Sequence, residues 1–297
     1  MSSISRSYQP TSPRFIPHKP IRNPLPPRKR VSYPKAMTLC IAAHCQHEGS
    51  PHIVLCCDWL SSDDYGSAET CDKLTWLKPG WFALLAGTVH KADEILAFFE
   101  EELKDLAITK TSALVEVRRL AREYMEHLRD HNSRLRYGFT VPELIKKRAF
   151  PKEDIDSISS MLTTSAEVII ATIIDGDPFI FEINMSGEVI LQPEYSTIGT
   201  IAQASAFMQW RCVTSQDSLP SMLFEVYESK RFAEMDKDVG AHTSLFVLYP
   251  DGDLYQVKAS YLAQMDKARR GFDSDRTKTR LPKSLGDWRF SKPEEFE

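Results

Sequence analysis

Short apolar blocks separated by turn residues begin at residue 38, which is the pattern of β-strands. In the first third of the chain this pattern predicts strands at 39–44, 52–57, 73–77 and 81–86. Residues 49–51 (Gly-Ser-Pro) and 78–80 (Lys-Pro-Gly) have the composition of turns, so the four strands fit two hairpins. Residues 61–70, between the hairpins, are mostly polar and are predicted to form a loop.

The apolar residues then change to helical spacing. Ile95, Leu96 and Phe99 recur as expected for a helix over 90–106. A second apolar stripe predicts a helix from Ser112, a suitable N-cap, to about residue 134. Residues 141–147 are predicted to form a short helix inside a long insertion at 137–163.

The second half of the chain repeats this order. The pattern predicts strands at 166–175, 179–183, 189–191 and 196–200, helices at 202–212 and 220–235, and a last hairpin at 243–249 and 254–257. Runs of strands alternating with pairs of helices predict an α+β fold. A four-layer αββα sandwich, with two antiparallel sheets between helix layers, is one compact solution. The βαβ alternation and glycine-rich motifs of nucleotide-binding folds are absent.

Composition divides the chain into a tail, a domain and an extension. Residues 1–36 contain eight prolines, which remove backbone donors, so we expect a disordered tail. The sequence leaves four interpretations of this basic tail open: a transit peptide, a targeting signal, a cleaved propeptide or a plain solvated segment. The domain is expected over 37–260, and residues 261–297 are expected to form a polar C-terminal extension.

Charge and cysteine usage exclude several classes of function. The tail carries +8, and subtracting this from the chain's −4 leaves −12 for residues 37–297, which argues against nucleic-acid binding. No apolar run reaches about 18 residues, and the N-terminus lacks an apolar centre, so neither a membrane span nor a signal peptide is predicted. Six cysteines without a CxxC pair are expected as reduced thiols of a cytoplasmic protein, with no metal site.

Six short motifs follow one another along the chain: residues 38–42, Asp58, 71–74, 84–87, 196–200 and 236–240. Lys73 and Gly87 are separated by a step of fourteen residues. Taken in this order, the motifs resemble the proteasome β-subunit family of N-terminal-nucleophile (Ntn) hydrolases, over residues 38–258. The likeness is closer still to bacterial proteasome homologues, which begin Met-Thr and expose the threonine by removal of the methionine.

The resemblance implies that Thr38 is a nucleophile when it is the first residue of the chain. Its α-amine would then have a pKa near 7.7–8.0, so a useful fraction would be neutral at pH 7. The neutral amine can accept the hydroxyl proton, directly or through water, while Oγ attacks a carbonyl carbon. Without a free amine at Thr38, this chemistry is not available.

Five further residues receive roles from the same resemblance. Lys73 would place a buried cation beside the nucleophile, and Asp58 would balance and orient that lysine. The N–H group of Gly87 would stabilise the oxyanion. Thr200 and Asp236 would form hydrogen bonds around the α-amine. Each residue alone also has an ordinary structural interpretation, such as a turn former, a strand end or a solvated acid.

Four positions depart from the family pattern. Met37 stands where processed subunits have glycine, and Leu60 where a basic residue is frequent. Ile201 replaces a glycine, and Val239 replaces a serine whose hydroxyl would lie near the amine. None of these changes removes the predicted nucleophile, lysine or oxyanion glycine.

The resulting hypothesis is a proteasome-like N-terminal-threonine hydrolase that cleaves peptide bonds through an acyl-enzyme on Thr38. It would need no cofactor, would act on peptide or protein substrates, and would assemble into a homo-oligomeric ring. One alternative is a catalytically inactive scaffold subunit that keeps its N-terminal tail. Another is an Ntn amidase that acts on a small non-peptide amide.

Overall fold

The computed structural model describes residues 38–63, 66–69, 73–87, 89–147, 164, 166–236 and 239–274. The predicted tail over 1–36, most of the 137–163 insertion and the last part of the predicted extension lie outside these residues.

The first antiparallel sheet has the strand order β10-β1-β2-β11-β12. Strand β1 lies between β2 and β10, so Leu39 is opposite Gly199 and Cys40 is opposite Cys57. The first seven residues of β1 are all buried, which explains why their sequence is continuously apolar instead of alternating. The strands are β1 Leu39–His47, β2 Ser50–Asp58, β10 Tyr195–Gly199, β11 Thr243–Leu248 and β12 Leu254–Gln256.

The second antiparallel sheet has the sequential order β5-β6-β7-β8-β9. Its strands are β5 Leu74–Lys78, β6 Trp81–Gly87, β7 Ala166–Ile174, β8 Asp177–Ile183 and β9 Val189–Gln192. Most of the strands predicted from the sequence are therefore present, with shifts of a few residues at their ends.

A small separate hairpin replaces part of the predicted polar loop. Strands β3 Leu60–Asp63 and β4 Gly66–Glu69 pair antiparallel, so the prediction of a loop over 61–70 was wrong for most of these residues. Backbone hydrogen bonds make this pairing, and polar sequence carries no burial pattern from which a strand could be predicted.

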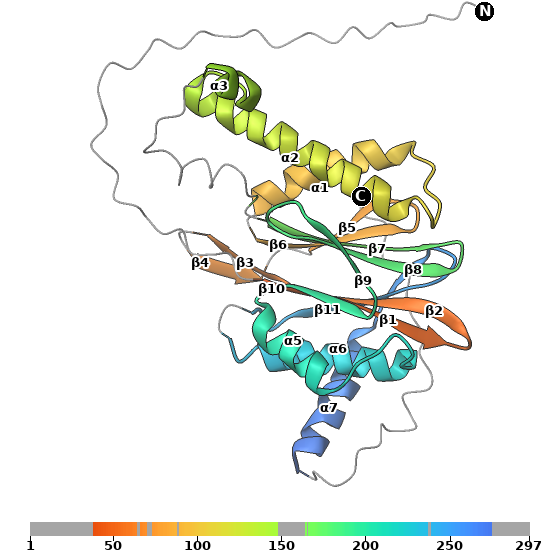
Figure 1. The fold of residues 1–297 in the computed structure, drawn as a ribbon. Coiled ribbons are helices and arrows are strands. Elements are labelled where there is room, and N and C mark those ends of the chain that lie inside the picture. The colour runs from red at the N-terminus through yellow and green to blue at the C-terminus, as the bar shows by residue number, and fades with distance from the viewer. Residues whose placement is uncertain are drawn as a thin grey trace, which may run out of the picture. The chain divides into compact units, whose positions relative to one another are not determined.

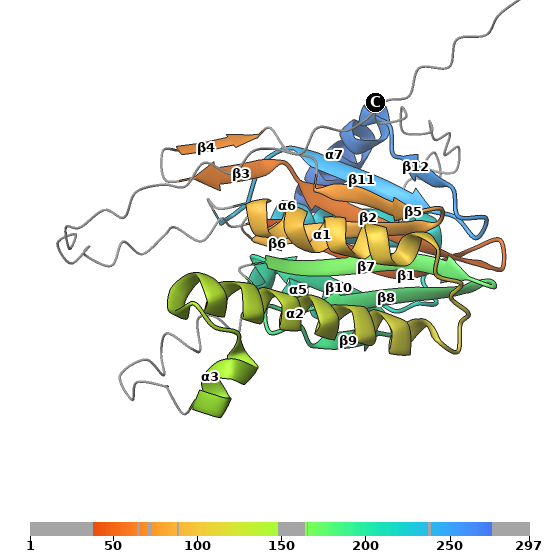
Figure 2. The same ribbon diagram turned by 90° about the horizontal axis from the view of Figure 1, so that it is seen from above.

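Helices contact both sheets, as Figures 1 and 2 show. Helices α1 and α2 pack on the β5–β9 sheet, whereas α5 and α6 pack on the sheet that contains β1. The helices are α1 Val89–Lys104, α2 Ala113–Tyr137, α3 Val141–Lys147, α5 Ile201–Trp210, α6 Leu219–Ala233 and α7 Ala259–Ser274. The predicted α+β class with two antiparallel sheets is confirmed.

Helix α7 falls largely within the predicted polar extension. Met265 is completely buried in the cluster beneath α6, and Leu262 packs against that cluster. The first part of the C-terminal segment is therefore attached to the domain by apolar contacts. The sequence pattern did not predict this helix, because few apolar residues anchor it among many charged ones.

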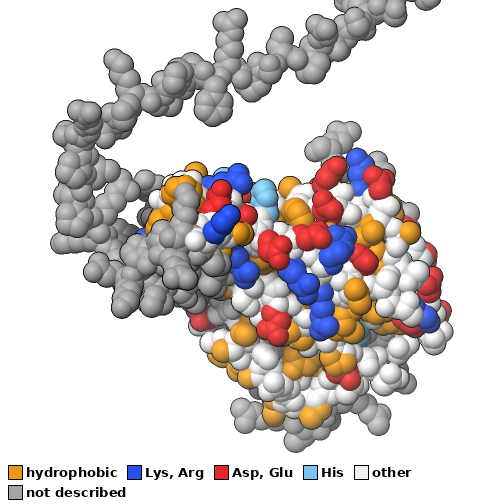
Figure 3. All heavy atoms as spheres, turned by 45° about the horizontal axis from the view of Figure 1, so that its top comes forward, with side chains coloured by type: hydrophobic (Ala, Val, Ile, Leu, Met, Phe, Trp, Pro, Cys, Tyr) orange, Lys and Arg blue, Asp and Glu red, His pale blue; other side chains and the backbone are white. Residues whose placement is uncertain are grey.

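The outer face of the α1–α2 layer is rich in charge. Figure 3 shows Lys and Arg side chains interspersed with Asp and Glu side chains on this face. Among the described helices, none combines the length and apolar content that crossing a membrane requires.

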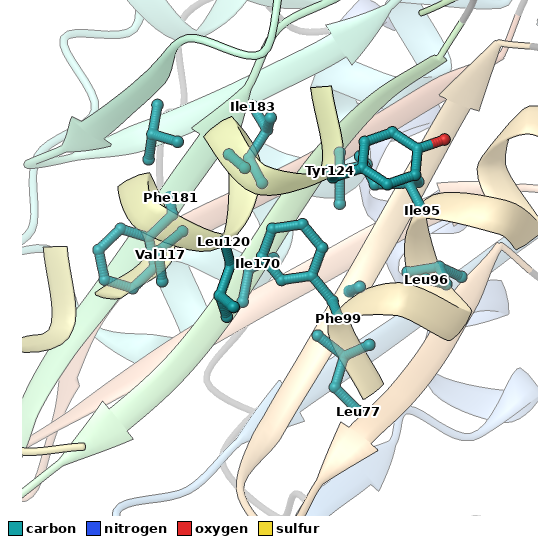
Figure 4. Close-up of a cluster of buried hydrophobic side chains, with 14 of the residues drawn as sticks. Leu77, Ile95, Leu96, Phe99, Val117, Leu120, Tyr124, Ile170, Phe181 and Ile183 are labelled. Carbon is teal, nitrogen blue, oxygen red and sulfur yellow. The ribbon is translucent and has the colours of Figure 1, made fainter. Parts of the chain in front are cut away.

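Three buried clusters hold the layers together. One lies between the two sheets and includes Cys40, Leu55 and Phe246. A second lies beneath α1 and α2, where Phe99 and Leu120 meet residues of the β5–β9 sheet (Figure 4). The third lies between the β1 sheet and α5 and α6. Completely burying a large apolar side chain contributes about 1.5–3 kcal/mol, so these clusters are the main source of stability.

The cysteines of the first sheet are buried thiols. Cys40, Cys45, Cys56 and Cys57 are all inaccessible, and burial raises the pKa of Cys56 to about 12. A thiol in that state is a poor nucleophile and a poor metal ligand, because both roles need the thiolate. Cys212 is free and exposed, and Cys71 lies outside the described residues.

We expect stability to fall in acid because of His44 in β1. Its side chain is buried, with Nδ1 3.0 Å from the Pro193 carbonyl oxygen, and desolvation lowers its pKa to about 4. The unfolded chain binds a proton near pH 6.5, so folding stability due to neutral His44 is complete above that pH and is lost as the pH falls toward 4. Between pH 8 and pH 5 the loss should be about 2 kcal/mol.

Urea unfolding at pH 8 and pH 5 measures this loss. The variant His44→Asn should show a pH difference smaller by about 2 kcal/mol than the unmodified protein. The same substitution at His131, which is exposed on α2, serves as the control for replacement of a histidine by asparagine. An equal pH difference in the His44 variant would contradict the assignment.

Candidate active site

Thr38, Asp58 and Lys73 meet at one end of the two sheets. Because β1 and β2 run antiparallel, the start of β1 lies beside the end of β2, which brings Thr38 next to Asp58. Lys73 immediately precedes β5 of the other sheet. All three are buried, with 3%, 0% and 5% of their surfaces exposed. The fold therefore brings together three of the six predicted site residues, which lie up to 35 positions apart in the sequence.

The ammonium group of Lys73 connects this group. Its Nζ donates to Thr38 Oγ1, to Asp58 Oδ1 at 2.6 Å and to the carbonyl oxygen of Leu60 at 2.5 Å. A lysine has three donors, and each has an acceptor here. A buried cation is stable only when it is paired and fully hydrogen-bonded, and Asp58 supplies the pairing charge.

The carboxylate of Asp58 is fixed by two backbone groups. The N–H of Leu39 donates to Oδ1 at 3.2 Å, and the N–H of Gly240 donates to Oδ2 at 2.8 Å. Asp58 therefore connects the start of β1, Lys73 and the segment before β11. Its orientation, and that of Lys73, does not depend on solvent.

Position 60 contributes through its backbone. The family pattern favours a basic side chain there, but it is the Leu60 carbonyl that accepts from Lys73. The change to leucine leaves this hydrogen bond intact. The same oxygen lies 3.4 Å from Thr38 Oγ1.

Thr200 lies against the backbone of Thr38. The Thr200 N–H donates to the Thr38 carbonyl oxygen at 2.7 Å. Its own hydroxyl oxygen, Oγ1, is buried and has no hydrogen-bond partner in the described part of the chain. Unpaired buried hydroxyl groups are unfavourable, so this oxygen is available to a further donor or acceptor.

Gly199 allows this close approach. Its φ is +88°, and a Cβ there would lie 1.8 Å from the Thr38 carbonyl oxygen and 3.2 Å from Cβ of Ala86. Only glycine fits such a position without displacement of the backbone. Glu167 accepts a hydrogen bond from the Gly199 N–H at 3.0 Å and supports the turn.

Gly87 and Asp236 lie in segments that border this group. Gly87 ends β6 with a φ of +109°, directly after Ala86, whose side chain lies beside Gly199. Asp236 follows α6, and its carbonyl oxygen accepts from the N–H of Val239, just before Gly240. The predicted roles of these two residues, in oxyanion stabilisation and amine binding, stay predictions.

Val239 occupies the position where the family pattern has serine. Its side chain is buried in the cluster beneath α5 and α6. The valine therefore packs in the core, and its apolar contacts hold the segment whose next residue, Gly240, binds Asp58.

Lys230 is a buried residue that the sequence analysis missed. It lies in α6 with none of its surface exposed, and its Nζ donates to Glu234, to the Gly240 carbonyl at 2.6 Å and to the Ala241 carbonyl at 3.0 Å. Desolvation lowers the pKa of this lysine. Lys230 thus anchors the segment that donates to Asp58. Lysines in amphipathic helices usually face solvent, so no sequence signal distinguished this one.

Metal ligands and cavities are the other features that could give this region a function. No group of three or more His, Cys, Asp and Glu side chains in the described residues could hold a metal ion. A cavity of about 430 Å³ is lined by Trp59, the neighbour of Asp58, and by parts of β11 and α7, but by none of the six predicted site residues.

Comparison with known proteins identifies related folds. No family model and no curated protein matches the chain. The Anbu (Gly-1) mutant from Hyphomicrobium sp. strain MC1 is similar in structure, with 16% identity and a TM-score of 0.52 over 80% of this chain and 98% of its own. Anbu from Yersinia bercovieri, described as an ancestral beta-subunit, has 16% identity and a TM-score of 0.55 over 83% and 99%.

These neighbours correct the family assigned from the sequence. The motifs predicted a proteasome β-subunit closest to the bacterial homologues that begin Met-Thr, and this prediction was wrong. The two structures described above are Anbu proteins, so the chain has a proteasome-like Anbu fold, and at 16% identity the likeness extends to the fold alone. Short motifs at strand ends specify a local backbone arrangement, and they do not separate related branches that share it.

Replacement of Gly199 should be strongly destabilising. In Gly199→Ala the new methyl group overlaps the Thr38 carbonyl oxygen, so we expect a loss of more than about 2 kcal/mol in the free energy of unfolding. Gly176 is a matched control, because its φ is +80° and a Cβ added there would have no atom within 4 Å. Gly176→Ala should cost only about 1 kcal/mol. Denaturant unfolding measures both, and equal losses would contradict the close contact.

Replacement of Lys230 should also be costly. Lys230→Met leaves the Gly240 and Ala241 carbonyls without their donor, and we expect a loss of about 2–4 kcal/mol. Lys110 is the control, because it forms an ion pair with Asp177 while half exposed. Lys110→Met should change stability by less than about 0.5 kcal/mol. A loss that small for Lys230→Met would show that the buried lysine does not hold the segment.

Proposed function

We propose that this chain is an Ntn hydrolase of the four-layer αββα type, which cleaves amide bonds through Thr38. The observation that carries the proposal is the hydrogen bond from buried Lys73 to Thr38 Oγ1, with Asp58 as the counter-charge. A cation beside a hydroxyl oxygen favours the alkoxide over the alcohol. A purely structural threonine at a strand start needs no such arrangement.

The reaction begins with attack of Thr38 Oγ on the carbonyl carbon of an amide. The Thr38 α-amine, made available by cleavage of the Met37–Thr38 bond, accepts the hydroxyl proton. The tetrahedral intermediate then collapses, the C–N bond breaks, and the leaving amine takes that proton. A water molecule hydrolyses the resulting ester on Oγ, which releases the acid and restores the hydroxyl group.

The surrounding residues have distinct roles in this scheme. Lys73 stabilises the developing negative charge on Oγ, and Asp58 keeps Lys73 in place. The N–H of Gly87 stabilises the oxyanion. Thr200 and Asp236 orient the α-amine. The unpaired hydroxyl of Thr200, whose own N–H binds Thr38, supports this role for Thr200.

The substrate class and the assembly follow from the same proposal. The bonds cleaved are peptide bonds of peptides or proteins, and the protein works as a homo-oligomer, in a ring, without a cofactor. The similarity to the protein described as an ancestral beta-subunit supports the assembly.

A catalytically inactive scaffold subunit is the second candidate. The observation that favours it is the burial of Thr38, only 3% exposed, since a substrate cannot reach an inaccessible hydroxyl group. In this case residue 37 stays attached to Thr38, and the Lys73–Asp58 pair has only a structural role.

Intact mass and N-terminal sequencing of the purified protein separate the two candidates. A chain that begins at Thr38 supports the hydrolase, and a chain that retains residues 1–37 supports the scaffold. Activity is assayed with a panel of fluorogenic peptides and, in parallel, with small non-peptide amides. Hydrolysis of the small amides alone would identify an amidase.

Loss of the Thr38 hydroxyl should abolish hydrolysis. We expect Thr38→Ala and Lys73→Met to lower kcat by at least about a thousandfold, because they remove the nucleophile and its cation. Thr172→Ala is the matched control, because Thr172 is also a buried strand threonine but lies in the other sheet. It should retain most of the activity. Full activity of Thr38→Ala in a correctly folded protein would exclude Thr38 as the nucleophile.

A further inference from the structure

A second cavity lies between α2 and the turn that joins β8 to β9, and it is separate from the residues around Thr38. Its volume is about 410 Å³, within the range of small-molecule pockets. The helix lines one side and residues 186–189 line the other, and the side chains from α2 are Arg118, Arg122, Met125 and Arg129.

The three arginines form a row on one face of α2. Their positions, together with Met125, follow steps of four, three and four residues, which places them on the same helical face. From Arg118 to Arg129 the helix axis advances by about 16 Å. The cavity is therefore lined with guanidinium-bearing side chains along its length.

These arginines are poorly neutralised, in contrast to their neighbour Arg119. Arg119 lies outside the cavity and forms ion pairs with Glu116 at 2.9 Å and Glu123 at 2.7 Å. Arg122 is exposed, and in the described part of the chain Nε of Arg129 is buried without a hydrogen-bond partner. Arg118 donates two long bonds, of 3.4 and 3.5 Å, to the Val189 carbonyl.

The opposite wall of the cavity is well fixed. A Cβ on Gly187 would lie 2.3 Å from Cγ of Met125, so the turn packs directly on the helix. Asn184 Oδ1 accepts hydrogen bonds from the Ser186 N–H at 3.0 Å, the Ser186 hydroxyl at 2.6 Å and the Glu188 N–H at 3.1 Å. A preformed wall of this kind lowers the entropic cost of binding a ligand.

The charge of the lining indicates the class of ligand. Three arginines face one acidic side chain, Glu188, which accepts a hydrogen bond from Asn184 at 3.2 Å. Guanidinium groups bind phosphate and carboxylate oxygens in a bidentate manner. A row of three such groups suits a chain of linked anionic groups better than a single ion.

We propose that this cavity binds a small polyanion that carries two or three linked phosphate groups. Free oligophosphate and the phosphate chain of a nucleotide share this chemistry. The site does not depend on Thr38 or on the hydrolase, so it can be tested in a protein that has no peptidase activity.

Titration calorimetry of the full chain with tripolyphosphate, ATP and citrate at one ionic strength tests the proposal. Tripolyphosphate should bind, and Arg122→Gln and Arg129→Gln should each weaken it about tenfold or more, as expected for loss of one charge-assisted hydrogen bond. Arg119→Gln removes the same charge outside the cavity and should change the affinity less than about twofold. Glu188→Gln removes the one repulsive charge and should tighten binding.

The relative affinities for ATP, tripolyphosphate and citrate identify the class of ligand, and two further results would overturn the site. ATP that binds more tightly than tripolyphosphate identifies a nucleotide, and equal affinity identifies the phosphate chain alone. Equal binding of citrate would overturn the preference for phosphate. Absence of tripolyphosphate binding, or an equal loss in Arg119→Gln and Arg122→Gln, would overturn the site itself.

Discussion

The buried ion pair between Lys73 and Asp58 is the interaction on which the arrangement around Thr38 depends. Two charges inside a protein are costly unless each is fully satisfied, and here every donor of Lys73 has an acceptor. Those acceptors come from the start of β1, the end of β2 and the residue that begins β3. Loss of either charge would leave the other buried and unpaired, so the pair specifies how these segments meet.

The glycine and lysine contacts outside the pair serve the same arrangement. Gly199 permits the Thr38 carbonyl to approach the next strand, and Gly240 provides an N–H for Asp58. Lys230, in helix α6, donates to the Gly240 carbonyl and so fixes this segment from the helical layer. The surroundings of Thr38 thus draw on both sheets and on the helices that cover one of them.

Much of this could be predicted from the sequence, because the buried strands carry continuous apolar runs and the helices carry clear stripes. The β3–β4 hairpin and helix α7 were missed, since backbone pairing and a few anchoring residues leave little trace in composition. The meeting of Thr38, Asp58 and Lys73 was anticipated through motif order. The role of the Leu60 carbonyl was not anticipated, because a backbone acceptor does not depend on the identity of the side chain. The role of Lys230 was not anticipated either, because nothing in the sequence distinguishes a buried lysine from an exposed one. The family was misassigned for the related reason that local motifs report local geometry.

The hydrogen bond between Gly240 and Asp58 joins residues 182 positions apart. During synthesis Thr38 and Asp58 emerge from the ribosome early, and their surroundings stay incomplete until almost the whole domain has been translated. Contacts of such high sequence separation form slowly, because the entropic cost of closing a long loop must be met first. A chain synthesised only as far as β10 therefore lacks the N–H group that holds Oδ2 of Asp58, so the surroundings of Thr38 stay incomplete until residue 240 has been made.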